Sequence, residues 1–328
     1  MKIFSLPHLV INELIRQFEP TALIKLSFCS KKAHSAVKMF AKNRKGVELQ
    51  LCSYYQNGYS LSVSNNVLIH AFSNQTRDLD TSALKTMHGL RWSVDEHRNL
   101  YTYWQNIAVG CRRTTNYVCD LLNVPVSTVI VDSEEDLWLL DMAQRRQEQT
   151  LKKLIILHSF KMNAESYSSI LSCNTTDSLK CISTPPRGYH FDGPLPSTRN
   201  ILIFHGFWIT REHLLDLESQ NAQLLFTRVS SFDINALLRY WLDGGLANLK
   251  YLKIHGRAFG EEVYEGIRNR LERFQRGLSY TWDDHEPDVK FNSRAFHLRK
   301  EHNVVATVMI HEWSFTIAVW PDLKGDFV

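Results

Sequence analysis

The chain has 328 residues, of which 44% are hydrophobic and 22% charged, and its formal net charge is +4. This length and composition indicate a folded protein of two unequal domains. No apolar run is long enough for a membrane span, and the basic runs are too short and too poor in aromatics for a nucleic-acid surface, which argues against both partners.

Six scattered cysteines without a C-x-x-C pair fit reduced thiols in an intracellular protein. We expect the chain in the cytoplasm, with the nucleus as a second location because of the short basic run at 42–45.

Three short helices are predicted between residues 7 and 42. Pro7 and Pro20 sit where a first-turn proline is tolerated, because its missing N–H would have no helical partner there. Each helix carries an apolar face at helical spacing. The residues of these faces are Val10, Ile11, Leu14, Ile15 and Phe18, then Leu23, Ile24, Leu26 and Phe28, then Ala33, Ala36, Val37 and Phe40. A unit of this size cannot bury all of them alone, so it must pack on the rest of the chain or on a partner.

The amino-acid sequence of these helices resembles the F-box. The matching runs are Phe4-Ser5-Leu6-Pro7-His8-Leu9-Val10, Pro20-Thr21-Ala22-Leu23-Ile24-Lys25-Leu26-Ser27 and Cys29-Ser30-Lys31-Lys32. The chain looks most like the nematode-type F-box family, whose members add an F-box-associated domain, and residues 233–242 and 249–252 resemble that domain. One departure is that many F-boxes have a tryptophan in the third helix, where this chain has Phe40.

The resemblance implies an adaptor without catalytic chemistry, cofactor or metal. An F-box binds the Skp-type linker of a cullin–RING ubiquitin ligase and reaches the cullin through that linker. Carried over by position, the linker-binding residues are Leu6, Pro7, Ile11, Leu23 and Leu26. The remainder of the chain then holds an unknown target protein.

A β-hairpin follows the helical module. Val47, Leu49 and Leu51 alternate with polar residues, as do Tyr59, Leu61 and Val63, with Asn57-Gly58 between the two runs. A third run at 67–69 extends the hairpin to a meander. We expect this meander to lie between the helices and a larger domain and to connect them. The predicted segments are residues 3–44 (F-box), 45–110 (hairpin or meander and linker) and 111–328 (F-box-associated, repeat-like, target-binding).

From about residue 113 strands and helices alternate with a regular period. The central strand positions are residues 129, 154, 179, 201, 224 and 252, and their separations of 22 to 28 residues fall in the range of leucine-rich repeats. Helical patterns at 135–146, 210–217 and 232–242 lie between them. The predicted fold is therefore mixed α+β or α/β, a three-helix F-box followed by a leucine-rich-repeat-like domain with parallel strands.

A helix and a β-hairpin are predicted near the C-terminus. Residues 260–276 are expected to form a helix with acidic residues early and arginines late. Residues 304–310 and 315–320 are expected to form a C-terminal β-hairpin that pairs with the last repeat.

The concave face of the repeats carries the candidate target-binding residues. Its strand positions are apolar, which fits either a sheet covered on both faces or an exposed binding face. These positions are Ile130, Ile155, Leu157, Leu202, Phe204 and Leu225.

The motif search finds no catalytic signature of the common hydrolase, nucleotide-binding, kinase or zinc-protease types. The leading hypothesis is a substrate-recognition adaptor of a ubiquitin ligase. The alternatives are a repeat-domain scaffold acting outside a ligase and, more remotely, an enzyme of another α/β family, which a polar pocket with convergent titratable groups would support.

Overall fold

The computed structural model divides into two compact units, Met1–Ile156 and Leu157–Val328. This division does not follow the three predicted segments, which are defined by family and function. The basic run at 42–45 lies outside the described residues. The structure describes residues 6–41, 47–54, 58–63, 66–73, 85–87, 90–94, 100–147, 150–157, 161–173, 175–273, 279–280, 289–300 and 304–320.

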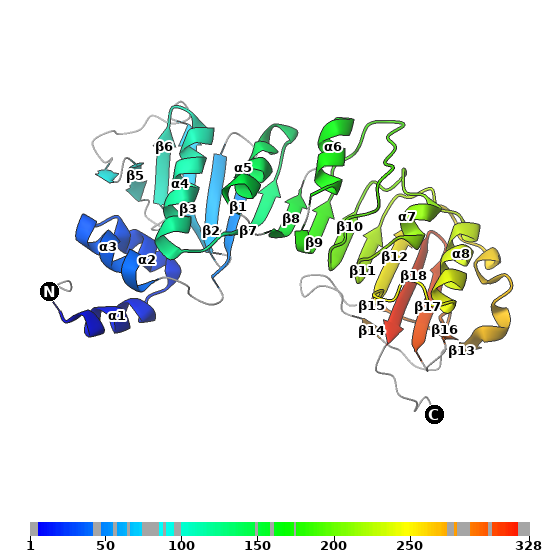
Figure 1. Cartoon of the computed structure of the whole chain (residues 1–328). Coiled ribbons are helices and arrows are strands. Elements are labelled where there is room, and N and C mark those ends of the chain that lie inside the picture. The colour runs from blue at the N-terminus through cyan, green and yellow to red at the C-terminus, as the bar shows by residue number, and fades with distance from the viewer. Residues whose placement is uncertain are drawn as a thin grey trace. The chain divides into compact units, whose positions relative to one another are not determined.

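The three N-terminal helices are confirmed as α1 (His8–Gln17), α2 (Pro20–Ser27) and α3 (Lys31–Phe40) (Figure 1). Pro20 occupies the first turn of α2, as expected. The hydroxyl of Ser30 accepts a hydrogen bond from the backbone N–H of Ala33 at 3.1 Å and so begins α3.

The first unit contains a mixed sheet whose strands run in the order β8-β7-β1-β2-β3-β6-β5-β4. The predicted hairpin and meander are confirmed as β1, β2 and β3. These strands belong to the larger sheet and do not form a separate element that connects the helices to it, because β1 pairs in parallel with β7. The bounds are β1 (Leu49–Tyr54), β2 (Gly58–Val63), β3 (Asn66–Ser73), β4 (Lys85–Met87), β5 (Leu90–Val94), β6 (Leu100–Trp104), β7 (Val126–Val131) and β8 (Leu151–Ile156).

Two helices, α4 (Ile107–Leu122) and α5 (Trp138–Arg146), lie on one face of this sheet (Figure 1). A short 3-10 turn, η3 (Glu134–Asp136), precedes α5. Gly110 lets α4 approach β6, because a Cβ at this position would lie about 2.2 Å from the ring of Trp104. No helix that the structure describes, α4 included, is long and apolar enough to cross a membrane.

The second unit begins with four parallel strands, β9 (Thr175–Cys181), β10 (Asn200–Ile203), β11 (Asn221–Leu224) and β12 (Tyr251–His255). Helices α6 (Ala164–Leu171), α7 (Arg211–Leu215) and α8 (Ser231–Leu242) cover one face of the sheet (Figure 1). The predicted alignment of the third of these strands is wrong by two residues. Ala222 pairs with Ile201 and Leu252, so Leu224 aligns with Ile203 instead.

The predicted C-terminal hairpin is confirmed as β17 (Val305–His311) and β18 (Ser314–Trp320). It joins the last parallel strand, because β18 pairs antiparallel with β12. The sheet then continues through β16 (Phe296–Arg299) to β13 (Leu271–Arg273), and β14 (Ser279–Tyr280) and β15 (Val289–Lys290) form a separate pair.

The helix expected at 260–276 is wrong. Two short 3-10 turns, η4 (Glu261–Tyr264) and η5 (Arg268–Arg270), and strand β13 occupy this stretch. Gly266 between the turns has a φ of 70°, which is outside the helical region and ends any regular helix there. The acidic-to-basic charge order therefore did not specify a helix.

A capping box holds the start of α8. The Asp233 carboxylate accepts hydrogen bonds from the Ser230 N–H at 2.9 Å and hydroxyl at 2.6 Å. It also pairs with the Arg211 guanidinium at 2.9 Å. Burial alone would raise the pKa of Asp233, but these hydrogen bonds and the charge of Arg211 outweigh it and lower the pKa from its ordinary value.

Asp233→Asn is therefore expected to lower the free energy of unfolding by about 1–2 kcal/mol near pH 7. A lowered folded-state pKa gives a contribution that is complete above the unfolded pKa of about 3.9 and lost as the pH falls through the folded value. Urea unfolding of both proteins should show their difference shrinking toward about pH 3. A difference that stays constant or grows on acidification would contradict the assignment.

Candidate functional site

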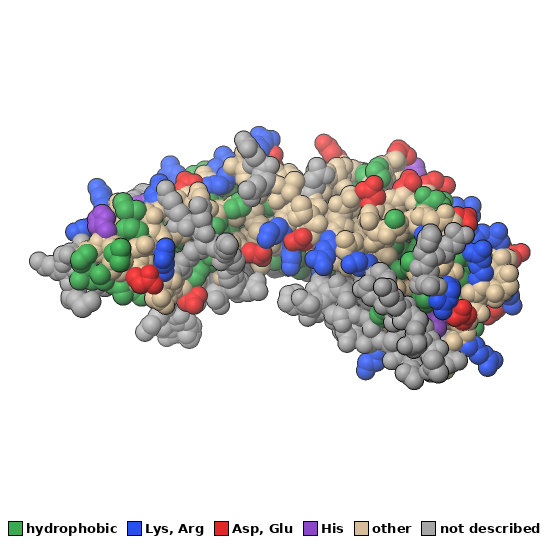
Figure 2. Space-filling view, turned by 60° about the horizontal axis from the view of Figure 1, so that its bottom comes forward, with side chains coloured by type: hydrophobic (Ala, Val, Ile, Leu, Met, Phe, Trp, Pro, Cys, Tyr) green, Lys and Arg blue, Asp and Glu red, His purple; other side chains and the backbone are tan. Residues whose placement is uncertain are grey.

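An exposed apolar patch lies on the N-terminal helices. Leu9 is 82% exposed, Val10 42% and Met39 57%. The rings of His8 and Phe40 meet edge to face at 6.0 Å, which places the start of α1 beside the end of α3. We call Leu9, Val10, Met39 and Phe40 the α1/α3 patch. Figure 2 shows hydrophobic side chains gathered over the N-terminal helices.

The predicted linker-binding residues divide into accessible and buried side chains. Pro7 is exposed, and Leu6 and Leu26 are half-buried. Ile11 and Leu23 are 5% and 0% exposed and lie inside the module. Helical spacing could not separate these groups, because it identifies apolar residues without showing which of them face the interior. Buried side chains offer a partner little surface.

Tyr117 of α4 joins the helical module to the first unit. Its hydroxyl lies 2.7 Å from the Ser27 hydroxyl and 3.1 Å from Nδ1 of His34. Its ring contacts that of Phe28 at 4.9 Å, and Phe28 also contacts Trp92 at 5.4 Å. Burial raises the pKa of Tyr117 to about 12, so its hydroxyl stays protonated at neutral pH. The module is thus held through α2 and α3, away from the α1/α3 patch.

Of the six predicted target contacts, two lie in the first unit and four in the second. In the first unit, Ile130 of β7 and Ile155 of β8 are register partners and both are half-buried. Leu157, at the start of the second unit, is 45% exposed. Leu202, Phe204 and Leu225 lie in the second unit.

Part of the face that carries Leu202 is covered. Leu202 is half-buried and packs against a buried cluster that includes residues of β12, β17 and β18. The members of this cluster are Tyr251, Phe291, Ala295, Met309 and Ala318. At this position the expectation of a covered sheet describes the structure better than that of an open binding face.

Phe204 belongs to a group of rings at the carboxyl ends of β10, β11 and β12, which we call the edge cluster. The Phe226 ring lies 5.0 Å from Phe204, 5.9 Å from His205 and 5.4 Å from His255. Burial lowers the pKa of His205, which favours its neutral form. Leu225 directly precedes Phe226.

Phe226 is the exposed member of this cluster. It is 49% exposed and has a φ of 51°, a left-handed conformation that is rare for a bulky residue. Such a conformation costs free energy and is often found at functional sites. Sequence reasoning missed Phe226 because no residue pattern signals a positive φ at a phenylalanine.

A cavity of about 330 Å³ near α7 is lined by titratable groups. His213 is 6% exposed, and its Nδ1 lies 3.1 Å from the Thr210 N–H that it caps. Burial lowers the pKa of His213, while hydrogen bonds to the backbone of Phe191 and Gly193 oppose this shift. The capping contact and these backbone bonds hold the His213 ring in place at the wall of the cavity.

The six cysteines form no disulfides. Five of the six are buried, and all six are free thiols. Burial raises the pKa of Cys119 to about 11 and that of Cys111 to about 12, which disfavours the nucleophilic thiolate. Within the described ranges no group of three His, Cys, Asp or Glu residues is placed to hold a metal ion.

Comparison with known families gives two matches. Residues 3–45 match the model described as F-box domain, and residues 190–254 match the one described as F-box associated. The first match contains α1 to α3, and the second contains α7, α8 and three rings of the edge cluster. These matches confirm the resemblance to nematode-type F-box proteins.

Two relatives from Caenorhabditis elegans are similar to the chain. The Skn-1 dependent zygotic transcript 15 protein is 23% identical over 270 residues, which cover 75% of this chain and 76% of that protein. The E3 ubiquitin-protein ligase hecw-1 is 31% identical over 85 residues, which cover 25% of this chain and only 7% of that protein. No solved structure matches the chain.

Proposed function

We propose that this chain, which carries an N-terminal F-box domain and an F-box-associated region, is the substrate-recognition adaptor of an SCF-type cullin–RING ubiquitin ligase. The F-box domain at residues 3–45 is the observation that carries the proposal. The partners are a Skp-type linker, a cullin reached through that linker, and a target protein. The adaptor performs no catalysis itself and acts by holding the target near the activated ubiquitin. Its proposed location is the cytoplasm, with the nucleus second.

The linker is proposed to contact the α1/α3 patch together with Leu6, Pro7 and Leu26. Exposed apolar side chains that become desolvated are the usual carriers of protein–protein affinity. The patch has three such residues on two adjacent helices, and the attachment through Tyr117 leaves them accessible. Ile11 and Leu23 are proposed to hold α1 and α2 in position for the contact.

Residues 111–328 are proposed to form a repeat-like, target-binding domain. Its parallel strands β9 to β12 follow one another in sheet order, with a helix between β10 and β11 and another between β11 and β12. This succession supports a leucine-rich-repeat-like architecture. The target is proposed to contact the edge cluster, which includes Phe204 and adjoins Leu225. Ile130, Ile155 and Leu157 remain further proposed contacts.

Phe226→Asn tests the target-binding edge. Asparagine tolerates the left-handed conformation, so the substitution should remove the ring while keeping the free energy of unfolding within about 0.5 kcal/mol of wild type. Proximity labelling should then lose at least one protein that wild type enriches. Phe232→Asn is the matched control, because Phe232 is 60% exposed but lies on α8 outside the cluster. A partner set that is unchanged in F226N, or changed equally in F232N, would contradict the assignment.

Affinity capture of the full chain from cells tests the adaptor role. We expect the Skp-type linker and a cullin to be recovered together in stoichiometric amounts. Recovery of the linker without the cullin would favour the alternative of a scaffold acting outside a ligase. Recovery of neither would contradict both the adaptor role and the docking claim.

A further inference from the structure

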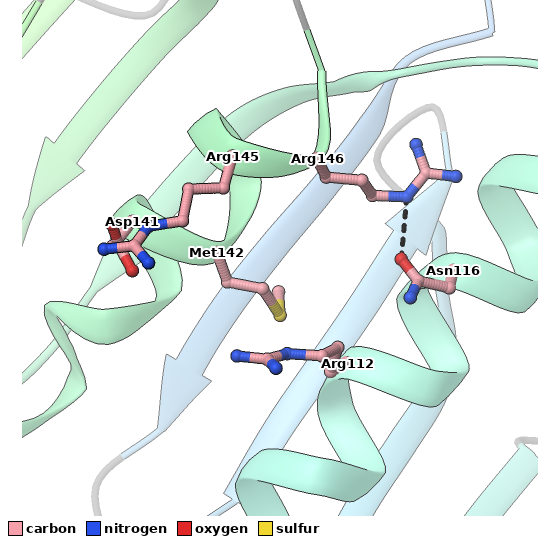
Figure 3. Close-up of a pocket in the computed structure, with 6 residues that line it drawn as sticks. All are labelled: Arg112, Asn116, Asp141, Met142, Arg145 and Arg146. Atoms are coloured by element: carbon pink, nitrogen blue, oxygen red, sulfur yellow. Dashed lines mark hydrogen bonds and ion pairs between the residues drawn. The ribbon is translucent and has the colours of Figure 1, made fainter.

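An arginine-rich pocket lies between α4 and α5 of the first unit (Figure 3). Its volume is about 270 Å³. The residues that line it are Arg112, Asn116, Asp141, Met142, Arg145 and Arg146. Three arginines against one aspartate give this lining a net positive charge, although the charge of the whole chain is mild.

The three guanidinium groups are held to different degrees. Arg146 is fixed across the two helices, because its Nε donates to Asn116 Oδ1 at 2.8 Å and its Nη2 to Asp120 at 2.6 Å. These two bonds leave three of its five N–H groups for other acceptors. Arg146 therefore presents a preorganised donor at one side of the pocket.

The other two arginines can turn toward a ligand. Among the described residues Arg112 has no hydrogen-bond or ion-pair partner. Arg145 pairs with Asp141 at 2.6 Å, but both side chains are largely exposed, at 80% and 55%. An exposed pair of this kind contributes little stability and is readily exchanged for a stronger partner. Met142, 6% exposed, lines the pocket between Arg112 and the two arginines of α5 and is its apolar member (Figure 3).

We propose that this pocket binds a phosphorylated serine or threonine side chain of a partner protein. A phosphate monoester carries about −1.5 to −2 charges at pH 7 and three acceptor oxygens, so it can engage more of the guanidinium groups around this pocket than a single carboxylate can. Arginine forks bind such oxygens in pairs. The pocket lies outside both family matches and does not depend on linker docking.

Fluorescence anisotropy with the full chain tests the proposal. The probe is a short labelled glycine–serine peptide with one central phosphoserine, compared with the same peptide carrying serine or glutamate at that position. We expect the phosphopeptide to bind at least about tenfold more tightly than either comparison peptide, because charge-assisted bonds to a dianion outnumber those to a monoanion. Arg112→Gln and Arg145→Gln should each weaken it by about three- to tenfold.

Arg113→Gln is the matched control, because Arg113 is exposed on the same helix but does not line the pocket. It should change the affinity by less than about twofold. Thermal unfolding of each variant verifies that it is folded. Equal binding of the serine or glutamate peptide, or an equal loss in R112Q and R113Q, would overturn the proposal, as would the absence of saturable binding.

Discussion

Leu9→Asp is expected to weaken binding of the Skp-type linker at least about 100-fold, which corresponds to about 2.7 kcal/mol. Leu9 is the most exposed apolar side chain of the α1/α3 patch, at 82%. A carboxylate at this position would have to be desolvated in the interface without a partner, while the apolar contact would be lost. Calorimetric titration measures the affinity. The free energy of unfolding should stay within about 0.5 kcal/mol of wild type, because the side chain makes few contacts in the folded chain.

Phe18→Asp is the matched control for this substitution. Phe18 is 38% exposed and directly follows α1, at the opposite end of that helix from Leu9. We expect it to change linker affinity by less than about threefold. The Leu6→Ala/Pro7→Ala double variant should fall between the two. If L9D binds like wild type, or if F18D is equally damaging, the α1/α3 patch is not the docking surface.

Phe28→Ala is expected to lower the free energy of unfolding by about 3–5 kcal/mol. Phe28 is 2% exposed and packs on the rings of Tyr117 and Trp92. Its removal leaves a cavity beside Tyr117 of α4, so the helical module loses an apolar contact with the rest of the unit. Urea unfolding followed by circular dichroism measures the loss.

The matched control for the packing prediction is Phe18→Ala. The same atoms are removed from a side chain that is 38% exposed, so we expect a loss below about 1 kcal/mol. Limited proteolysis adds a local measurement, since detachment of the module in F28A should expose cleavage sites before the remainder of the chain unfolds. Equal losses in F28A and F18A would show that the contact with Tyr117 and Trp92 does not secure the module.

Much of the fold could be predicted because its strongest patterns are local. The three N-terminal helices, the hairpin around Asn57-Gly58 and the C-terminal hairpin all follow from apolar periodicity and turn residues. Helix α4 was missed because its buried face is built largely from small and weakly apolar residues. These include Gly110, Cys111, Thr114, Thr115 and Cys119, which a count of large hydrophobic residues does not register.

The errors in the second unit have specific causes. In β11 the residue that aligns with Ile201 and Leu252 is the small Ala222, so side-chain size favours the larger Leu224, two residues later, as the central position. At 260–276 the charge order favoured a helix, whereas the positive φ of Gly266 divides the stretch into turns. Repeat spacing indicated the parallel strands but could not set their exact register.

The candidate sites could be predicted only in part, because they depend on which elements come together. The sequence identified the F-box residues but not which of them are exposed. The edge cluster requires the ends of three strands to be aligned and Phe226 to adopt a left-handed conformation. The arginine pocket joins residues of α4 and α5 that lie about thirty positions apart, and their meeting follows from helix packing on a shared sheet.

Docking of the N-terminal module on a Skp-type linker underlies the proposed adaptor role. Calorimetric titration of purified linker into the purified full chain tests this docking. We predict a one-to-one complex with a dissociation constant below about 1 μM, which corresponds to about 8 kcal/mol. Addition of a cullin should then give a ternary complex that co-elutes in size-exclusion chromatography. If the linker does not bind the folded wild-type chain, the proposed docking of the N-terminal module is wrong.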